Sequence, residues 1–195
     1  MRPQPKNLSM DNKNFIKVYE NVISHSFCDD LIQKFESSSN QWENRNSLSS
    51  ERNLSFKELH CFKYMDFWKT ENDALTDIFI MYINDYKKQF SKFCFPDKYA
   101  LEPFKMKKYE PNGIDEFGWH VDVTSRGNME RFLAFFLYLS DNEEGKTEFP
   151  YQNTTTECVK GSMVVFPPMW PWYHRGTKPI KEPKYFMGSY LLYVD

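Results

Sequence analysis

Apolar positions in the chain change their spacing near residue 100, where a helical pattern gives way to a pattern of short strands. In residues 26–37, apolar side chains recur at helical spacing behind Ser26, which can cap the first turn: Phe27, Leu31, Ile32 and Phe35. In residues 70–90, the same spacing follows Thr70, another suitable N-cap, and gives a longer stripe: Leu75, Ile78, Phe79, Tyr82, Ile83, Tyr86 and Phe90. We therefore predict two helices and expect the longer stripe to pack against a sheet.

The rest of the first half has weaker patterns. Residues 1–13 are polar and contain two prolines, which predicts a flexible N-terminal arm. Residues 15–19 and residues 58–66 are predicted as strands. Residues 40–54 are rich in Ser, Asn and Arg with Trp42 as an anchor, and this composition predicts a loop or a partly mobile lid.

The second half reads as a series of short strands. Residues 131–140 are apolar at nearly every position, which predicts a central strand covered on both faces. The other predicted strands are residues 104–109, 119–123, 148–149, 156–159, 163–166 and 185–194. Short strands that follow helices indicate an antiparallel double sheet of jelly-roll type. The predicted fold is therefore an α+β protein with one domain over residues 14–195, in which residues 24–98 give helical support and residues 102–195 form the jelly-roll core.

Composition and charge narrow the classes of function. The 195 residues include 18 Phe, 12 Tyr and 5 Trp, which suits a globular protein with an aromatic core. The formal net charge of −2 provides no broad basic field, so we expect neither nucleic acid nor a membrane surface as a partner. The chain has no apolar leader and no uncharged stretch of spanning length, and its four cysteines form no CxxC pair. These features predict a cytoplasmic protein whose cysteines are reduced.

His120, Asp122 and His174 are the candidate metal ligands. His120 and Asp122 are two residues apart, so on an extended strand their side chains leave the same face and can reach one ion. His174 follows after enough chain to fold back through several strands. Two imidazoles and one carboxylate make the facial triad of non-haem Fe(II) oxygenases, which leaves metal positions open. The other two histidines, His25 and His60, are expected to cap, to pack or to face solvent.

Lys184 and Tyr109 are the candidate co-substrate residues. Lys184 follows His174 by ten residues, and a dicarboxylate that chelates a metal at its keto acid end needs a fixed cation for its other, buried carboxylate. Tyr109 could donate its hydroxyl to that same carboxylate. Each residue also has an ordinary alternative: Lys184 could be a solvated lysine beside Lys178 and Lys181, and Tyr109 could be a core residue.

Taken in order, these residues resemble the Fe(II)- and 2-oxoglutarate-dependent dioxygenases, and within them the prolyl 4-hydroxylase-like group. The segment Glu144-Gly145-Lys146-Thr147-Glu148-Phe149-Pro150 resembles that group's Gly-Gly-x-Thr-x-Phe-Pro turn. The other matching features are Tyr109, His120-x-Asp122, the strand RFLAFFLYLSD, Lys160-Gly161-Ser162 through Phe166-Pro167, His174-x-Gly176 and Lys184. The resemblance covers residues 104–194 closely and the helical first half more loosely.

The resemblance implies a double-stranded β-helix with iron between its two sheets, held by His120, Asp122 and His174. It implies Fe(II), 2-oxoglutarate and O₂ as cofactors, with ascorbate as a candidate addition. Lys184 and Tyr109 would bind the distal carboxylate of 2-oxoglutarate. The implied reaction is hydroxylation of an unactivated C–H bond with release of succinate and CO₂, and the preferred substrate is a proline in a peptide or protein.

The chain departs from the group at two positions that bear on the substrate. Glu144 stands where the turn has its first glycine, and Tyr190 stands where several collagen-type prolyl hydroxylases have tryptophan. Arg126 and Arg131 could meet a substrate or could be solvated arginines at a sheet edge. A set of aromatic residues could form a wall for a proline-rich peptide or could pack at the barrel mouth: Trp119, Trp170, Trp172 and Tyr173.

Two alternative functions stay open on the sequence. The first keeps the chemistry and changes the substrate to another protein side chain or to a small molecule. The second is a catalytically silent jelly-roll binding module that keeps metal ligands for structure. A structural zinc site would need four protein ligands, and the sequence offers no evident fourth ligand near the triad.

Overall fold

The computed structural model describes residues 15–48 and 53–195, so the predicted flexible arm at residues 1–13 lies outside the described residues. The two long helices are α1 (His25–Ser37) and α2 (Met65–Lys88). Short 3-10 turns occur at Ser39–Gln41, Cys61–Tyr64, Lys92–Cys94, Pro150–Gln152 and Trp170–Trp172. In the part of the chain that the structure describes, no helix is both long enough and apolar enough to span a membrane.

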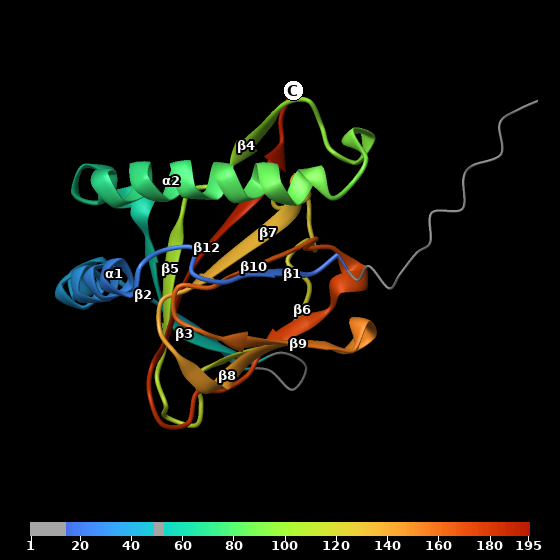
Figure 1. Cartoon of the computed structure of the whole chain (residues 1–195). Helices are drawn as coiled ribbons and strands as arrows, with labels where there is room; N and C mark the ends of the chain where they lie inside the picture. Colours follow the sequence, from blue (N-terminus) through green and yellow to red (C-terminus); the bar gives the residue numbers. More distant parts are fainter. Residues whose placement is uncertain (1–14, 49–52) are drawn as a thin grey trace, which may run out of the picture.

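Antiparallel strands make up the rest of the architecture. They are β1 (Lys17–Tyr19), β2 (Glu43–Leu48), β3 (Asn53–His60), β4 (Tyr99–Leu101), β5 (Lys105–Tyr109), β6 (Glu116–His120), β7 (Arg131–Tyr138), β8 (Asn142–Phe149), β9 (Thr154–Cys158), β10 (Met163–Phe166), β11 (His174–Gly176) and β12 (Lys184–Tyr193). The strand order is β1-β10-β7-β12-β5-β3-β6-β11-β8-β9, with β2 paired to β3 and β4 paired to β12. Figure 1 shows how this sheet turns back on itself, so that β8 and β9 lie across from β7 and β10.

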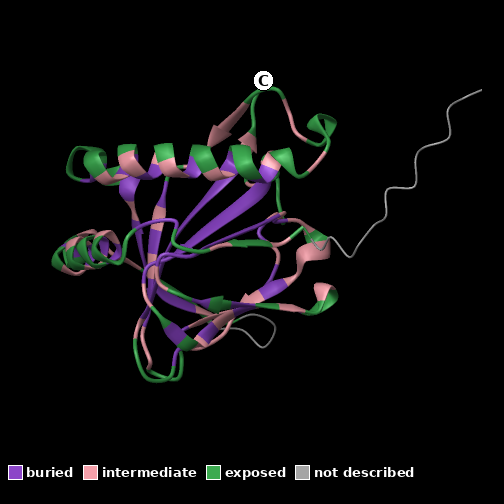
Figure 2. Ribbon diagram, in the orientation of Figure 1, coloured by how far each residue is buried: buried purple, intermediate pink, exposed green. Residues whose placement is uncertain are grey.

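Two apolar clusters hold the fold together. One lies between the helices and the sheet, and α2 crosses the strands there (Figure 1) with its predicted stripe buried at Leu75, Phe79, Ile83 and Tyr86. The other lies between the two layers of the sheet and is mostly aromatic: Phe56, Tyr109, Phe136, Tyr138, Phe149, Phe166, Phe186 and Tyr190, with Ala134, Cys158 and Val164. Figure 2 shows that the strands of the sheet are largely buried, while the outer side of α2 is exposed. The inner cluster is the one that surrounds the candidate site.

The structure corrects both predicted helix starts. The cap of α1 is Ser24, whose hydroxyl accepts a hydrogen bond of 3.1 Å from the backbone N–H of Phe27, and not Ser26. Helix α2 begins at Met65 and not at Thr70, and the predicted strand at residues 58–66 is wrong beyond His60. Trp68 is fully buried and extends the apolar stripe toward the N-terminus, so packing continues the helix past a suitable cap residue.

The predicted loop at residues 40–54 is also wrong over most of its length. Strand β2 pairs antiparallel with β3, from Glu43 opposite Glu58 to Leu48 opposite Asn53, and residues 49–52 lie outside the described residues. The side chains of Asn44, Arg45 and Asn46 are exposed. Backbone pairing at a sheet edge does not need apolar side chains, and for that reason composition failed to reveal this strand.

The strands of the second half agree better with the prediction. Strand β10 has the predicted bounds, and β7 lies between β10 and β12 with every position after Arg131 buried, as expected for a central strand. Strand β8 begins at Asn142, earlier than the predicted residues 148–149. Strands β1 and β3, from the first half of the chain, join the same sheet.

Candidate metal and co-substrate site

The register of two short strands brings the two predicted histidines together. His120 is the last residue of β6, His174 is the first residue of β11, and the two residues are directly paired across the strands. Their ring centroids lie 4.2 Å apart. Both side chains come from the layer of the sheet that contains β8 and β9, which we call the smaller layer; the larger layer contains β7 and β10. Both side chains point into the space between the layers, where both are buried.

Asp122 reaches the histidines from outside the strand. Strand β6 ends at His120, so the expectation that His120 and Asp122 share one strand is wrong. The Asp122 backbone N–H donates to the carbonyl of Pro168 at 3.1 Å, and its own carbonyl accepts from the Asn128 side-chain amide at 2.8 Å. These two bonds fix the turn after β6 and direct the carboxylate back toward the imidazoles.

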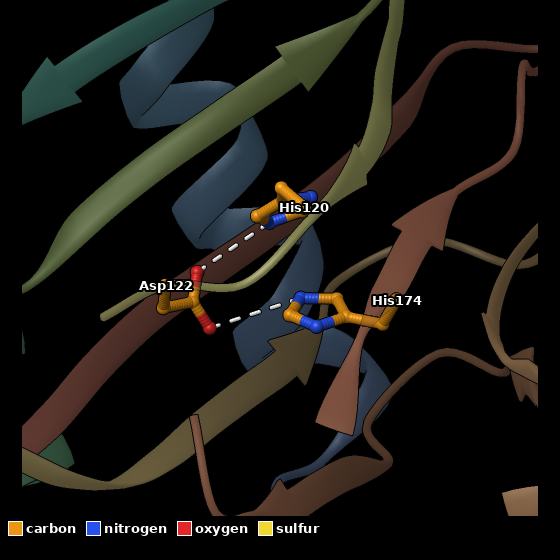
Figure 3. Close-up of side chains that lie close together, drawn as sticks. All are labelled: His120, Asp122 and His174. Atoms are coloured by element: carbon orange, nitrogen blue, oxygen red, sulfur yellow. Dashed lines mark ion pairs between the residues drawn. The ribbon is translucent and has the colours of Figure 1, made fainter. Parts of the chain in front are cut away.

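The three side chains converge on one point (Figure 3). The Asp122 carboxylate lies 3.4 Å from His120 through Oδ1 and Nε2, and 3.7 Å from His174 through Oδ2 and Nε2. One possible ligand atom from each residue lies within 4.8 Å of the others, and no second such group of three occurs among residues 15–48 and 53–195. All three residues are buried.

Backbone carbonyls fix the tautomer of each histidine. The Nδ1 atom of His120 lies 2.8 Å from the Gly118 carbonyl, and the Nδ1 atom of His174 lies 2.9 Å from the Trp172 carbonyl. A carbonyl can only accept, so each Nδ1 carries the proton and donates it, and each neutral ring presents the lone pair of Nε2. The lone pairs therefore face the carboxylate rather than a donor.

Two of these buried atoms have no hydrogen-bond partner in the structure: Asp122 Oδ2 and His174 Nε2. Buried acceptors without a donor are costly, and a divalent cation would satisfy both of them at once. The donor set of two imidazole nitrogens and one carboxylate suits Fe(II), and the outer hydrogen bonds at both Nδ1 atoms are typical of metal-binding histidines. The residues present therefore fit a metal ion.

The charge states that the surroundings favour are those that bind a metal. Burial, together with the neighbouring His120, lowers the pKa of His174 to about 4. Burial by itself would raise the pKa of Asp122, but the neighbouring His174, His120 and Lys107 outweigh it and hold that pKa below its ordinary value. A neutral imidazole and an ionised carboxylate can coordinate a metal without first losing a proton.

Aromatic side chains enclose the triad. The ring of Phe117 stacks on His120 at 3.6 Å between centroids, and Phe149 and Phe166 lie 5.4 and 4.9 Å from His174. Burial and the nearby Asp122 carboxylate raise the pKa of Tyr190 well above its ordinary value, so its hydroxyl remains protonated beside that carboxylate. The sequence marked Tyr190 only as a departure from a related group and did not reveal this contact.

A pocket opens from the triad into the inner cluster and encloses about 410 Å³, counting the part that is open to solvent. Its lining is Lys107, Tyr109, Phe117, His120, Phe136, Tyr138, Thr147, His174, Gly176, Thr177, Lys184 and Phe186. The predicted residues Lys184 and Tyr109 are directly paired between β12 and β5, so both reach the pocket from the larger layer of the sheet. The structure thus brings all five predicted site residues to one region.

Lys184 places a buried ammonium group in this pocket. The residue is 3% exposed, and burial lowers its pKa. Its Nζ lies 5.3 Å from the ring centroid of Tyr138 and 5.9 Å from that of Tyr109, and no described carboxylate forms an ion pair with it. A Cβ atom on Gly145 would lie 2.8 Å from Lys184 Cδ, so the glycine of the Glu144–Pro150 segment leaves the space that this side chain occupies.

The comparisons with known proteins agree with this geometry. The profile of the 2OG-Fe(II) oxygenase superfamily, where 2OG is 2-oxoglutarate, matches residues 104–192. This segment contains every predicted site residue, from Tyr109 to Lys184. A search of curated protein sequences found no match.

Solved oxygenase structures share the fold. The chain is similar to a viral collagen prolyl hydroxylase from Paramecium Bursaria Chlorella virus-1 in complex with 2OG, with 18% identity, a TM-score of 0.62, and coverage of 94% of this chain and 98% of that one. It is also similar to a prolyl hydroxylase from Trichoplax adhaerens in complex with a peptide fragment of the hypoxia inducible factor oxygen degradation domain. The identity is 16%, the TM-score is 0.63, and the match covers 93% of this chain and 84% of that one. For the α-ketoglutarate-dependent epimerase SnoN from nogalamycin biosynthesis, the identity is 11%, the TM-score is 0.63, and the match covers 92% of this chain and 78% of that one. At such low identities, the structural similarities show the fold alone, and they confirm the predicted double-stranded β-helix.

Other residues that were predicted as possible substrate contacts fall outside the pocket. Trp119 and Tyr173 stack on each other at 5.3 Å, and the guanidinium of Arg175 lies 4.6 Å from the centre of the Trp119 ring. None of the four residues of the predicted aromatic wall lines the pocket. Arg131 forms an ion pair of 2.6 Å with Glu102 and covers the ring of Tyr190 at 4.1 Å, whereas Arg126 is exposed.

The remaining histidines are separate from the triad. His25 is exposed at the start of α1. His60 Nε2 lies 3.0 Å from the buried carboxylate of Glu58, a contact that was not predicted. The two residues are two positions apart on β3, the spacing that could have revealed the contact. All four cysteines are free.

Other residues that line the pocket were not predicted as site residues, among them Tyr138, Thr147 and Lys107. Tyr138 forms a hydrogen bond of 2.7 Å with the hydroxyl of Thr147, and both residues line the pocket. Lys107 lies two residues before Tyr109 on β5 and enters the pocket from the same face of the strand. The alternation along β5 is the signal that could have identified Lys107, because a residue two positions from a pocket residue shares its side.

Proposed function

We propose that this protein is an Fe(II)- and 2-oxoglutarate-dependent dioxygenase in which His120, Asp122 and His174 hold the iron. The observation that carries the proposal is the pair of buried acceptors without a hydrogen-bond partner, Asp122 Oδ2 and His174 Nε2, which face each other at 3.7 Å. When bound, iron would supply the activation of O₂, with one oxygen atom going to the substrate C–H bond and the other to the succinate formed, with CO₂, from 2-oxoglutarate.

The chain's own residues would bind and orient the reactants. Lys184 would pair with the distal carboxylate of 2-oxoglutarate, since a buried carboxylate needs a fixed cation and this ammonium has no carboxylate partner among the described residues. Tyr109 would line the same end of the pocket, because it is paired with Lys184 across the strands. The phenyl rings of Phe117, Phe136 and Phe186 would exclude water from the reacting centre.

The substrate that we propose is a peptidyl proline, hydroxylated in the manner of a prolyl 4-hydroxylase. Support comes from two similar structures that are prolyl hydroxylases, one of them in complex with a peptide. Ascorbate belongs to this proposal as a further cofactor. The alternative substrate classes are another protein side chain and a small molecule, and the similarity to an epimerase with the same fold keeps the second of these open. A catalytically silent binding module is the remaining alternative.

The first experiment is an anaerobic titration of the metal-free protein with Fe(II) and 2-oxoglutarate. We expect the visible charge-transfer band of the metal chelate, and we expect His174→Ala to lose it while retaining its circular dichroism spectrum. The matched control is His25→Ala, which removes an exposed histidine and should keep the band. A folded wild-type protein without the band would favour the binding module.

A second experiment identifies the substrate class. The iron-loaded protein is incubated with 2-oxoglutarate, O₂ and separate panels of proline-containing peptides, other peptides and small molecules, and mass spectrometry measures the gain of one oxygen atom. We expect oxygen in the proline peptides and none in peptides whose prolines are replaced by alanine. Oxygen gained only by a different class would contradict the prolyl substrate and leave the dioxygenase chemistry intact.

A further inference from the structure

The pocket contains a second lysine that the proposed function does not use. Lys107 lies on β5, directly opposite Phe186 of β12, and its side chain is 12% exposed. Both ammonium groups lie near the ring of Phe186: Lys107 Nζ lies 5.4 Å from the ring centroid and Lys184 Nζ lies 5.8 Å from it. The two lysines therefore approach one cavity from neighbouring positions of the larger layer.

The protein leaves most of the bonding capacity of Lys107 unused. Its nearest carboxylate is Glu58 Oε2 at 3.8 Å, which is beyond hydrogen-bond distance. Glu58 has closer partners in His60 at 3.0 Å and Arg45 at 3.7 Å. Otherwise Lys107 Nζ lies over aromatic rings, 4.7 Å from the centroid of Phe56 and 5.1 Å from that of Phe117. No hydrogen bond joins this ammonium group to a residue within the described ranges, so its donors can serve an anion in the pocket.

Lys107 lies at the triad end of the pocket. Phe117, which it covers, stacks on His120. Lys184, in contrast, lies beside Tyr109 and Tyr138. One ammonium group is thus near the triad and the other is at the far end.

This arrangement matches a short dicarboxylate. A five-carbon dicarboxylate spans about 5 Å between its carboxylate carbons, and an ammonium group pairs with each carboxylate over a few ångströms more. Two ammonium groups that lie 5.4 and 5.8 Å from the centroid of one ring are both within reach of a molecule of this length in the pocket. Positive charge near each carboxylate also lowers the cost of bringing a dianion into a site that is closed to water.

We propose that Lys107 is a second co-substrate-binding residue, which pairs with the carboxylate at the keto acid end of 2-oxoglutarate while Lys184 pairs with the distal carboxylate. The inference rests on the proposed function and adds a residue to it. It also explains why a lysine is kept under aromatic rings at this position, where an apolar side chain would pack without the cost of burying a charge.

The test is calorimetric titration of the full chain with 2-oxoglutarate in the presence of Zn(II), an ion that binds histidine and aspartate and has no redox chemistry. We expect Lys107→Met to weaken 2-oxoglutarate binding by about tenfold or more, as the loss of a charge-assisted hydrogen bond predicts. The matched control is Lys105→Met, which removes the same charge from the same strand but outside the pocket, and which should change affinity less than about twofold. Thermal melts and bound zinc are measured for every variant.

A second ligand separates the two ends. 2-Oxobutyrate has the keto acid end and lacks the distal carboxylate, so wild type should prefer 2-oxoglutarate over it. Lys107→Met should keep this preference, because both ligands lose the same contact, whereas Lys184→Met should abolish it. If Lys107→Met abolished the preference instead, the assignment of the two ends would be overturned.

Two other outcomes distinguish this inference from the proposed function. Unchanged affinity of Lys107→Met for 2-oxoglutarate, with wild-type binding intact, would overturn the role of Lys107 and leave the dioxygenase proposal standing. No binding of 2-oxoglutarate to zinc-loaded wild type would overturn the dioxygenase proposal itself. If Lys107→Met does not fold, Lys107→Gln carries the same test, because its amide keeps a polar end near Glu58 without the charge.

Discussion

His120 and His174 are directly paired residues of β6 and β11, and their ring centroids lie 4.2 Å apart. Their separation is therefore set by strand pairing, which is among the most rigid relationships in the fold. Each imidazole is fixed further by a hydrogen bond from its Nδ1 to a backbone carbonyl. The two nitrogen donors are thus held in position by the backbone alone, before any metal binds.

Replacing His174 with alanine should abolish stabilisation by metal. A ligand at about a hundred times its dissociation constant stabilises the native state by roughly 2.7 kcal/mol, so wild type should melt at a higher temperature with Zn(II) than without it. His174→Ala should show no such shift. The control His25→Ala changes an exposed residue and should retain the whole shift. A full shift in His174→Ala would show that the metal binds elsewhere.

Tyr190→Phe should weaken metal binding while leaving the fold intact. The substitution keeps the ring that packs under Arg131 and removes only the hydroxyl beside the Asp122 carboxylate. Loss of such an outer partner typically costs about tenfold or more in metal affinity. Competition with a chromogenic chelator measures the affinity, and Tyr193→Phe, a half-exposed tyrosine on the same strand, is the control. Equal affinities of the two variants would contradict this positioning role.

Gly145→Ala should impair 2-oxoglutarate binding more than metal binding. The added Cβ would lie 2.8 Å from Lys184 Cδ and 2.6 Å from Asn142 Oδ1, so the lysine must shift. We expect at least an order-of-magnitude loss of 2-oxoglutarate affinity, comparable with the loss of one charged hydrogen bond. Gly127→Ala meets only one ordinary contact, at 3.8 Å, and serves as the control. Calorimetry on zinc-loaded protein checks both variants, and unchanged affinity would mean that Lys184 adapts.

Glu102→Gln should destabilise the protein in a pH-dependent way. Burial by itself would raise the pKa of Glu102, but its hydrogen bonds with Arg131 and Lys105 outweigh it and hold that pKa below the ordinary value. A depressed pKa stabilises the folded state above the unfolded-state value of about 4.3, and this contribution is lost as the pH falls through the folded value. At pH 7 we expect Glu102→Gln to lower the free energy of unfolding by about 1–3 kcal/mol.

Urea unfolding at several pH values tests this expectation. The difference between wild type and Glu102→Gln should shrink below about pH 4, because wild type then loses its own ionised carboxylate. Glu157 pairs with Lys146 at the exposed surface, and Glu157→Gln should change the free energy of unfolding by less than about 0.5 kcal/mol. A difference for Glu102→Gln that stays constant with pH would indicate lost packing rather than a lost ion pair.

Elements whose buried positions follow a simple period could be predicted before the structure was known. The stripe from Leu75 to Tyr86 and the apolar run of β7 were readable because helices and central strands repeat their buried positions at fixed intervals. The ordered residues from Tyr109 to Lys184 were readable because metal and carboxylate chemistry restricts the residue types. These signals are local, or depend on residue type alone.

The set of polar residues that share the pocket follows from how the folded chain brings distant segments together. The pairing of β2 with β3, the turn that brings Asp122 back from beyond β6, and the closeness of Tyr190 to Asp122 all depend on contacts between distant segments. Lys107 looked like any lysine of a basic strand until its register placed it over Phe117 and Phe186. The period of a strand gives the side on which a residue lies, but strand register and sheet closure decide what it faces there, and no local pattern encodes them.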